Sequence, residues 1–140
     1  MSDYPRVLYV EDDALSRMVI QILLHEALGL SHVVIFEDSR DFEARIDEFP
    51  FVPDIIMLDI HVKPLNGFQM LNILRQHPVY QNKPIVALTA SVMNEEVDQL
   101  KVAGFDGVLA KPINQATFPD ILHRVIEVSI FGTSVRRSYS

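Results

Sequence analysis

The sequence predicts an α/β fold in which a five-stranded parallel sheet is covered by helices on both faces. Short apolar runs of strand length alternate with amphipathic stretches of helix length along most of the chain. The apolar runs are nearly continuous and do not alternate with polar residues, as expected for strands that are buried on both sides of a sheet. Strands that alternate with helices favour parallel pairing through right-handed crossovers.

The predicted strands are the apolar runs that lie between turn and capping residues. They cover residues 6–10, 32–36, 54–58, 84–88 and 107–110. With a helix after each strand, the chain makes five β-α units, which is the pattern of the flavodoxin-like doubly wound fold. We therefore expect the strand order 2-1-3-4-5.

The predicted helices have recognisable start signals. They are expected over residues 14–28 and 41–48, from 66 to a break at 78, over 94–102, and within 114–129. Asp13, Asn66 and Asn94 are expected N-caps, because short polar side chains accept hydrogen bonds from the first helical N–H groups. Pro119 lacks an N–H and belongs in a first turn, so we expect the last helix to begin just after Thr117.

The composition fits one folded domain and excludes several classes of protein. The 140 residues are 49% hydrophobic and 22% charged, as is usual for a globular domain. The absence of cysteine excludes disulfides, thiolate zinc sites and a cysteine nucleophile. A net charge of −7 argues against nucleic-acid binding. No apolar run has the length of a membrane span and no secretory signal opens the chain, so we expect a cytoplasmic protein without membrane insertion.

The end of the chain differs in character from the rest. We expect residues 1–129 to form the domain and residues 130–140 to form a C-terminal tail. Ile130 and Phe131 are apolar residues just after the last helical turn. Two interpretations stay open: the helix end frays, or the tail contributes to a homodimer contact.

Polar residues follow the predicted strands at the sheet edge where ligands bind in open α/β folds. In chain order they are Glu11, Asp12, Asp59, Thr89 and Lys111. The first and third strands are neighbours in the expected order, so the three carboxylates should converge. Two carboxylates about 4 Å apart repel by about 4 kcal/mol at an effective dielectric constant of 20, so the cluster needs a cation or a proton. Oxygen ligands on a shallow rim suit Mg²⁺, while a lysine and a hydroxyl suit phosphoryl oxygens.

Four separated segments at these strand ends resemble the response-regulator receiver domain of two-component signalling. The segments are VLYVEDD at 7–13, DIIMLDIHVKPLNG at 54–67, LTA at 88–90 and GFDGVLAKP at 104–112. The resemblance covers roughly residues 5–128 and implies a receiver domain of the stand-alone type. Such a domain is a regulator that changes its protein partners on phosphorylation. It is not an enzyme, and its own chemistry is limited to Mg²⁺-dependent autophosphorylation and autodephosphorylation.

The resemblance implies a phosphoacceptor and a set of metal ligands. Asp59 would accept a phosphoryl group from a histidine kinase or a histidine phosphotransfer protein, and an unidentified downstream protein would read the result. Mg²⁺ would be held directly by Asp12 and Asp59. The backbone carbonyl of His61 would be a further ligand, and Glu11 would act through a water molecule.

The resemblance also implies how phosphorylation is sensed, and here the sequence departs from the family pattern. Thr89 and Lys111 would bind the phosphoryl oxygens, and the Lys111–Pro112 bond would be cis. Movement of Thr89 would shift the following loop and helix. The position of the family's switch aromatic is occupied by Val108, which has no ring to turn inward. The proline of segment 62–64 also lies one position later than usual, which places Lys63 near the pocket mouth.

Two other functions compete with the receiver interpretation. A phosphatase of the dehalogenase type would need a second Asp two residues after the nucleophile, where this chain has His61. A pseudo-receiver scaffold would act by protein–protein interaction without phosphorylation. The complete set of acids, threonine and lysine argues against that scaffold, although Val108 leaves some room for it.

Overall fold

The computed structural model describes residues 3–130 and shows the expected five-stranded parallel sheet. Its strands are β1 (Val7–Val10), β2 (Val33–Phe36), β3 (Ile55–Asp59), β4 (Ile85–Thr89) and β5 (Gly107–Ala110). Their order across the sheet is β2-β1-β3-β4-β5, and each neighbouring pair is parallel. This confirms the predicted doubly wound topology and places the carboxyl ends of β1 and β3 side by side.

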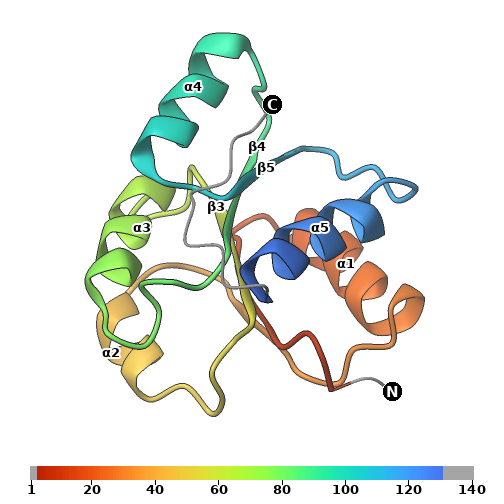
Figure 1. Ribbon diagram of the computed structural model, residues 1–140, viewed down its shortest axis with the longest axis horizontal. Coiled ribbons are helices and arrows are strands. Elements are labelled where there is room, and N and C mark those ends of the chain that lie inside the picture. The colour runs from red at the N-terminus through yellow and green to blue at the C-terminus, as the bar shows by residue number, and fades with distance from the viewer. Residues whose placement is uncertain (1–2, 131–140) are drawn as a thin grey trace.

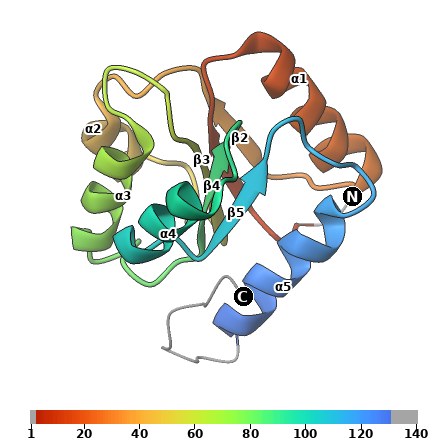
Figure 2. The same ribbon diagram turned by 90° about the horizontal axis from the view of Figure 1, so that it is seen from above.

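Helices cover both faces of the sheet. They are α1 (Ala14–Gln21), the π-helical segment η1 (Ile22–Ala27), α2 (Phe42–Asp47), α3 (Gly67–Gln76), α4 (Asn94–Ala103) and α5 (Phe118–Ile130). Figures 1 and 2 show α1 and α5 on one face, and α2, α3 and α4 on the other. In each described helix the apolar side therefore has a sheet face to pack against.

The alternation of side chains along each strand divides the core into two layers. Val7 and Tyr9 belong to the layer beneath α1 and α5, whereas Leu8 and Val10 belong to the layer beneath α2 and α3. Residues two apart in a strand point to the same face. Glu11 therefore continues the row of Tyr9, on the side of α1 and α5.

Two helix starts follow the predicted capping pattern. The carboxylate of Asp13 accepts a hydrogen bond of 2.8 Å from the Ser16 N–H at the start of α1. Asn66 and Gln69 form a reciprocal capping box at the start of α3. Asp13 lies three residues after β1, and Asn66 ends the longer loop after β3, so each cap fixes where the helix after an acid-bearing strand begins.

The start of α5 confirms its prediction, and the start of α4 corrects one. The Thr117 carbonyl accepts a hydrogen bond from the Ile121 N–H, and α5 begins at Phe118, so Pro119 lies in the first turn as predicted. Asn94 was expected to cap α4, but Met93 is the N-cap and Asn94 is the first helical residue. The Met93 carbonyl already accepts the first helical bond, so the helix starts one residue early without a side-chain cap.

The first helix also differs from expectation. A single α-helix was expected over residues 14–28, but its second half is the π-helical η1. There the Leu28 N–H donates to the carbonyl of Leu23, five residues back. The wider turn keeps both Leu23 and Leu24 buried before the chain reverses at Gly29, whose φ of 66° is readily adopted by glycine.

The expected C-terminal tail lies outside the described residues, apart from Ile130, which ends α5. The homodimer contact through the tail therefore stays a prediction. Among residues 3–130, no helix combines the length and apolar character needed to cross a membrane.

Candidate functional site

Three carboxylates meet at the carboxyl ends of β1 and β3. Glu11 and Asp12 directly follow β1, and Asp59 is the last residue of β3. One oxygen of each side chain lies within 4.8 Å of an oxygen of the other two. Glu11 is fully buried and Asp59 is 4% exposed, whereas Asp12 is exposed. The structure thus brings the three predicted acids together in a cluster that opens to solvent at Asp12.

Lys111 and Thr89 complete the predicted set at the same sheet edge. Lys111 Nζ lies 2.7 Å from Glu11 Oε1 and 3.5 Å from Asp59 Oδ2. The Lys111–Pro112 peptide bond is cis, as the resemblance implied. Thr89 ends β4, and its carbonyl accepts a 2.9 Å hydrogen bond from the Lys111 N–H, which ties the two residues together. The hydroxyl oxygen of Thr89 accepts a 3.1 Å hydrogen bond from the Ser91 N–H.

Burial and charge shift the protonation equilibria in this cluster. Burial raises the pKa of the Glu11 carboxyl, and its contact with Asp59 raises this pKa further, against the opposing hydrogen bonds from Lys111 and Tyr9. Burial also lowers the pKa of Lys111, but the hydrogen bond and charge of Glu11 outweigh this effect. The pKa of Lys111 therefore lies above its usual value, and the ammonium stays charged at neutral pH.

The donor set fits Mg²⁺. The three clustered side chains offer hard carboxylate oxygens, and the exposed Asp12 side leaves room for the water ligands that Mg²⁺ retains. One lysine offsets only part of the negative charge of three acids, so a divalent cation would relieve the remaining repulsion. The His61 N–H donates to Asp59 Oδ1 at 3.1 Å, which fixes the backbone beside the cluster. The His61 carbonyl stays a predicted ligand.

A buried serine holds the loop that follows β3. The hydroxyl of Ser39 donates to the Leu65 carbonyl and accepts from the Leu65 N–H, with both distances 2.7 Å. The Ser39 N–H donates to the Lys63 carbonyl at 3.2 Å. At the end of the loop, a Cβ added to Gly67 would lie 2.9 Å from the backbone Cα of Ile60, which leaves no room for a side chain there. Ser39 follows the second predicted strand, but its role was not predicted, because nothing in the sequence marks a contact between two loops.

Two partners of Glu11 were also missed. Tyr9 Oη donates to Glu11 Oε1 at 2.7 Å, and Arg17 donates to the Glu11 backbone carbonyl at 3.0 Å. The signal for Tyr9 was present, because residues two apart share a strand face and a buried tyrosine hydroxyl needs a partner. The Arg17 contact depends on how α1 packs, which the sequence does not specify.

Val108 occupies the predicted position on β5. Its half-buried side chain packs against the core layer that contains Leu100 of α4 and Phe105. A valine in this position has no aromatic ring that could exchange between an inward and an outward orientation. The prediction that this chain signals phosphorylation without a switch aromatic stays untested.

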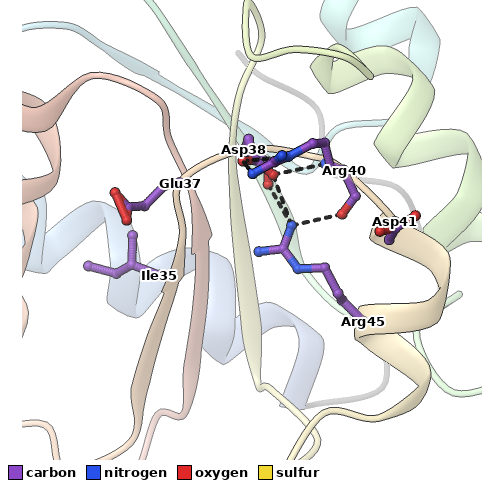
Figure 3. Close-up of a pocket in the computed structure, with 6 residues that line it drawn as sticks. All are labelled: Ile35, Glu37, Asp38, Arg40, Asp41 and Arg45. Atoms are coloured by element: carbon purple, nitrogen blue, oxygen red, sulfur yellow. Dashed lines mark hydrogen bonds and ion pairs between the residues drawn. The ribbon is translucent and has the colours of Figure 1, made fainter.

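A second polar pocket lies beside β2 and α2 and shares no lining residue with the carboxylate cluster. Its cavity of about 360 Å³ is lined by Ile35, Glu37, Asp38, Arg40, Asp41 and Arg45. Figure 3 shows Arg40 and Arg45 directed at Asp38, with nitrogen–oxygen distances of 3.0 and 3.2 Å. Asp38 is paired with both arginines, and two arginines line the pocket with three acids, so its excess negative charge is smaller than that of the cluster at β1 and β3.

Comparison with known sequences identifies relatives over most of the chain. The family model for the response regulator receiver domain matches residues 7–123. The chain is 29% identical over 118 residues to the signal transduction histidine-protein kinase BarA of Escherichia coli strain K12. That match covers 84% of this chain but only 12% of the kinase, so the chain spans a small part of this relative's length.

Solved structures of receiver proteins share the fold. The chemotaxis response regulator CheY4 of Vibrio cholerae superposes with a TM-score of 0.75 at 29% identity, over 86% of this chain and 97% of that one. The receiver domain of the sensor histidine kinase PA1611 from Pseudomonas aeruginosa PAO1 also gives a TM-score of 0.75 at 29% identity, over 88% of this chain and 98% of that one. The PA1611 structure holds a magnesium ion in its active site cleft.

Proposed function

This chain belongs to the response regulator receiver domain family, and from that premise we propose that Asp59 accepts a phosphoryl group and so controls which proteins the domain binds. Receiver domains act in two-component phosphorelay signalling as phospho-accepting regulators and not as classical enzymes. The observation that carries the proposal is the position of Asp59. Its carboxylate ends the buried strand β3, within the cluster of three acids and 3.5 Å from Lys111 Nζ.

The chain's own residues account for the transfer step. The nucleophile is a carboxylate oxygen, so unlike a serine hydroxyl it needs no neighbouring base to activate it. One oxygen of Asp59 forms a bond to phosphorus while the donor's bond to phosphorus breaks. The electron pair of that bond leaves with the donor atom, as imidazole from a phosphohistidine or as acetate from acetyl phosphate. Lys111 and Thr89 bind the phosphoryl oxygens on which negative charge is concentrated.

Mg²⁺ fits this site as the predicted cofactor. Asp12, Asp59 and the His61 carbonyl would hold it directly, and Glu11 would hold it through water. When bound, it would supply positive charge that offsets the charge of the phosphoryl oxygens. The support is the clustering of the three carboxylates, with Asp12 open to solvent.

Thr89 links the phosphoryl site to the surface. Its hydroxyl oxygen accepts a hydrogen bond from the Ser91 N–H. If the hydroxyl turned towards a phosphoryl oxygen, this bond would break and the start of the loop after β4 would be released. This loop carries the exposed apolar side chains of Val92 and Met93, which are 49% and 69% exposed. We infer that this loop and α4 carry the signal, since Val108 provides no ring for the usual readout.

The phosphoryl donor is proposed to be a histidine kinase or a histidine phosphotransfer protein, because the relatives include histidine kinases. A cytoplasmic location is part of this proposal, because the domain would exchange a phosphoryl group with such a kinase. The chemistry of the domain itself would be limited to Mg²⁺-dependent autophosphorylation and autodephosphorylation. Residues 1–129 would form the receiver unit and residues 130–140 its tail.

Intact-protein mass spectrometry tests the proposal. The wild type, incubated with Mg²⁺ and acetyl phosphate, is expected to gain one labile phosphoryl group, and a chelator should prevent this. Asp59→Asn should abolish the adduct, because the amide has the same shape but is a poor nucleophile. Asp98→Asn, at an exposed position of α4, is the matched control and should be phosphorylated normally. A stoichiometric adduct on Asp59→Asn contradicts the assignment, and a wild type without any adduct favours the scaffold function.

A further inference from the structure

We propose that Tyr9 is a positioning residue of this pocket: through Glu11 it holds Lys111 in place and sets the affinity of the pocket for a divalent cation. The inference rests on the proposed function, because it assigns a role within the same site. Tyr9 is fully buried in β1, and its hydroxyl is directed at the Glu11 carboxylate. Its effect on the chemistry is therefore exerted through Glu11.

The hydrogen bonds of Glu11 show how this works. Glu11 Oε1 accepts from Tyr9 Oη at 2.7 Å and contacts Lys111 Nζ at 2.7 Å, so one oxygen serves both partners. Glu11 Oε2 accepts a longer bond of 3.3 Å from the Asp13 N–H. The position of Oε1 therefore determines where the ammonium of Lys111 lies. The same ammonium reaches Asp59 Oδ2, the predicted site of phosphorylation, at 3.5 Å.

Tyr9 is the rigid member of this group. It lies on β1, an interior strand of the sheet, and is paired with Ile35 of β2 on one side and with Met57 of β3 on the other. Lys111 has a long flexible side chain that is 19% exposed, and a glutamate has three side-chain torsions to restrain. The Tyr9 hydroxyl is held in place by the core, so it can orient the Glu11 carboxylate and, through it, the Lys111 ammonium. Glu11 and Lys111 are both flexible and need such a fixed partner.

A second buried tyrosine shows what a purely structural hydroxyl looks like in this chain. Tyr80 is 3% exposed, and its hydroxyl donates to the Ile46 backbone carbonyl at 2.6 Å. That acceptor is held by α2 and belongs to no cluster of charged side chains. Tyr9 differs, because its acceptor is a side-chain carboxylate of the site itself. Loss of an outer partner of a direct metal ligand typically weakens metal binding 10–100-fold, and because Glu11 acts through water, the lower end of that range is expected for Tyr9.

The test compares Tyr9→Phe with Tyr80→Phe, since each substitution removes one buried hydroxyl and keeps the ring. The dissociation constant for Mg²⁺ is measured by isothermal titration calorimetry, and stability is measured by thermal melting. Tyr9→Phe is expected to weaken Mg²⁺ binding about tenfold. Tyr80→Phe should lose stability but bind Mg²⁺ like the wild type. Even at saturating Mg²⁺, Tyr9→Phe should be phosphorylated more slowly than the wild type, because Lys111 is no longer held in place.

A double-mutant cycle tests whether Tyr9 acts through Glu11. In a Glu11→Ala background, the further change Tyr9→Phe should leave the Mg²⁺ dissociation constant unchanged. An undiminished effect in that background would overturn the inference, because Tyr9 would then act by another route. In the wild type, NMR signals of the Tyr9 ring should shift on addition of Mg²⁺ while those of Tyr80 should not, and equal responses would also overturn it.

The remaining outcomes separate this inference from the proposed function. If the wild type is phosphorylated and Tyr9→Phe binds Mg²⁺ as tightly as Tyr80→Phe, Tyr9 is only a core residue, and the proposed function stands. If the wild type neither binds Mg²⁺ nor accepts phosphate, the proposed function and this inference fail together.

Discussion

Buried charge occurs at both ends of the sheet, but it is matched at the amino end and in excess at the carboxyl end. At the amino ends of β4 and β5, Arg75 Nη2 lies 2.7 Å from Asp106 Oδ2, with side-chain exposures of 13% and 6%. At the carboxyl end, three clustered carboxylates share the ammonium of Lys111. The two regions belong to one sheet, so the difference in charge balance points to different roles for the two sets of charged residues.

The matched pair joins segments of the backbone. Asp106 Oδ2 also accepts a 3.0 Å hydrogen bond from the Ile85 N–H, at the start of β4. Arg75 donates to three carbonyls of nearby loops, those of Gln81, Lys83 and Gly104. Charge whose partners all lie within the protein holds loops in place, whereas an excess of negative charge favours binding of a cation.

The largest effect is expected at the amino end. Arg75→Met should lower the free energy of unfolding by about 3–5 kcal/mol, because it leaves the buried Asp106 carboxylate without its cation. Denaturant unfolding measures this loss. Arg124→Met, at an exposed position of α5, is the control and should change stability by less than about 0.5 kcal/mol. A loss below about 1 kcal/mol for Arg75→Met would show that the pair does not hold these loops.

A smaller effect that depends on metal is expected at the carboxyl end. Lys111→Met should lower the free energy of unfolding by about 1.5–3 kcal/mol in chelator, because Glu11 loses a charged hydrogen bond. Added Mg²⁺ should recover part of this loss, since a cation can replace the missing positive charge. The loss caused by Arg75→Met should be the same with and without Mg²⁺. Equal metal dependence in the two variants would remove the distinction between the two ends.

The smallest effect concerns pH. Burial raises the pKa of Glu11 in the folded protein, so the folded state binds a proton at a higher pH than the unfolded chain does. The metal-free protein should therefore gain stability as pH falls from neutral towards the ordinary pKa of glutamate. Glu11→Gln should lack this gain in melting curves. The lowered pKa values of Asp13 and Asp38 act with the opposite sign, but below the ordinary aspartate range.

The site at the carboxyl end could be predicted because few geometric choices were open. Parallel strands end at a common edge, so residues that directly follow or end the strands must meet there. The strand order alone was enough to predict that Glu11, Asp59 and Lys111 lie close together. Asp13 and Asn66 were predictable as caps for a similar reason, because their partners lie three residues along the chain.

Contacts between distant segments were not predictable in the same way. The Arg75–Asp106 pair depends on where α3 ends relative to the loop before β5, and no sequence pattern encodes that distance. The Ser39 contact depends likewise on two loops of irregular shape. Tyr9 is a different case, because strand alternation already placed its hydroxyl beside Glu11. It was missed because the sequence analysis considered only the residues that end or follow the strands.

Whether the three carboxylates form one cation site is tested most directly by melting curves of the wild type, Asp59→Asn and Asp12→Asn. Each protein is measured with Mg²⁺ and with chelator at constant ionic strength. At ten times its dissociation constant, Mg²⁺ should stabilise the wild type by about 1.4 kcal/mol, or roughly 3–6 °C. Both variants should melt higher than the wild type in chelator and gain less from Mg²⁺, because one excess charge causes both effects. A wild type that gains nothing from Mg²⁺, or variants that gain as much as the wild type, would contradict a shared cation site.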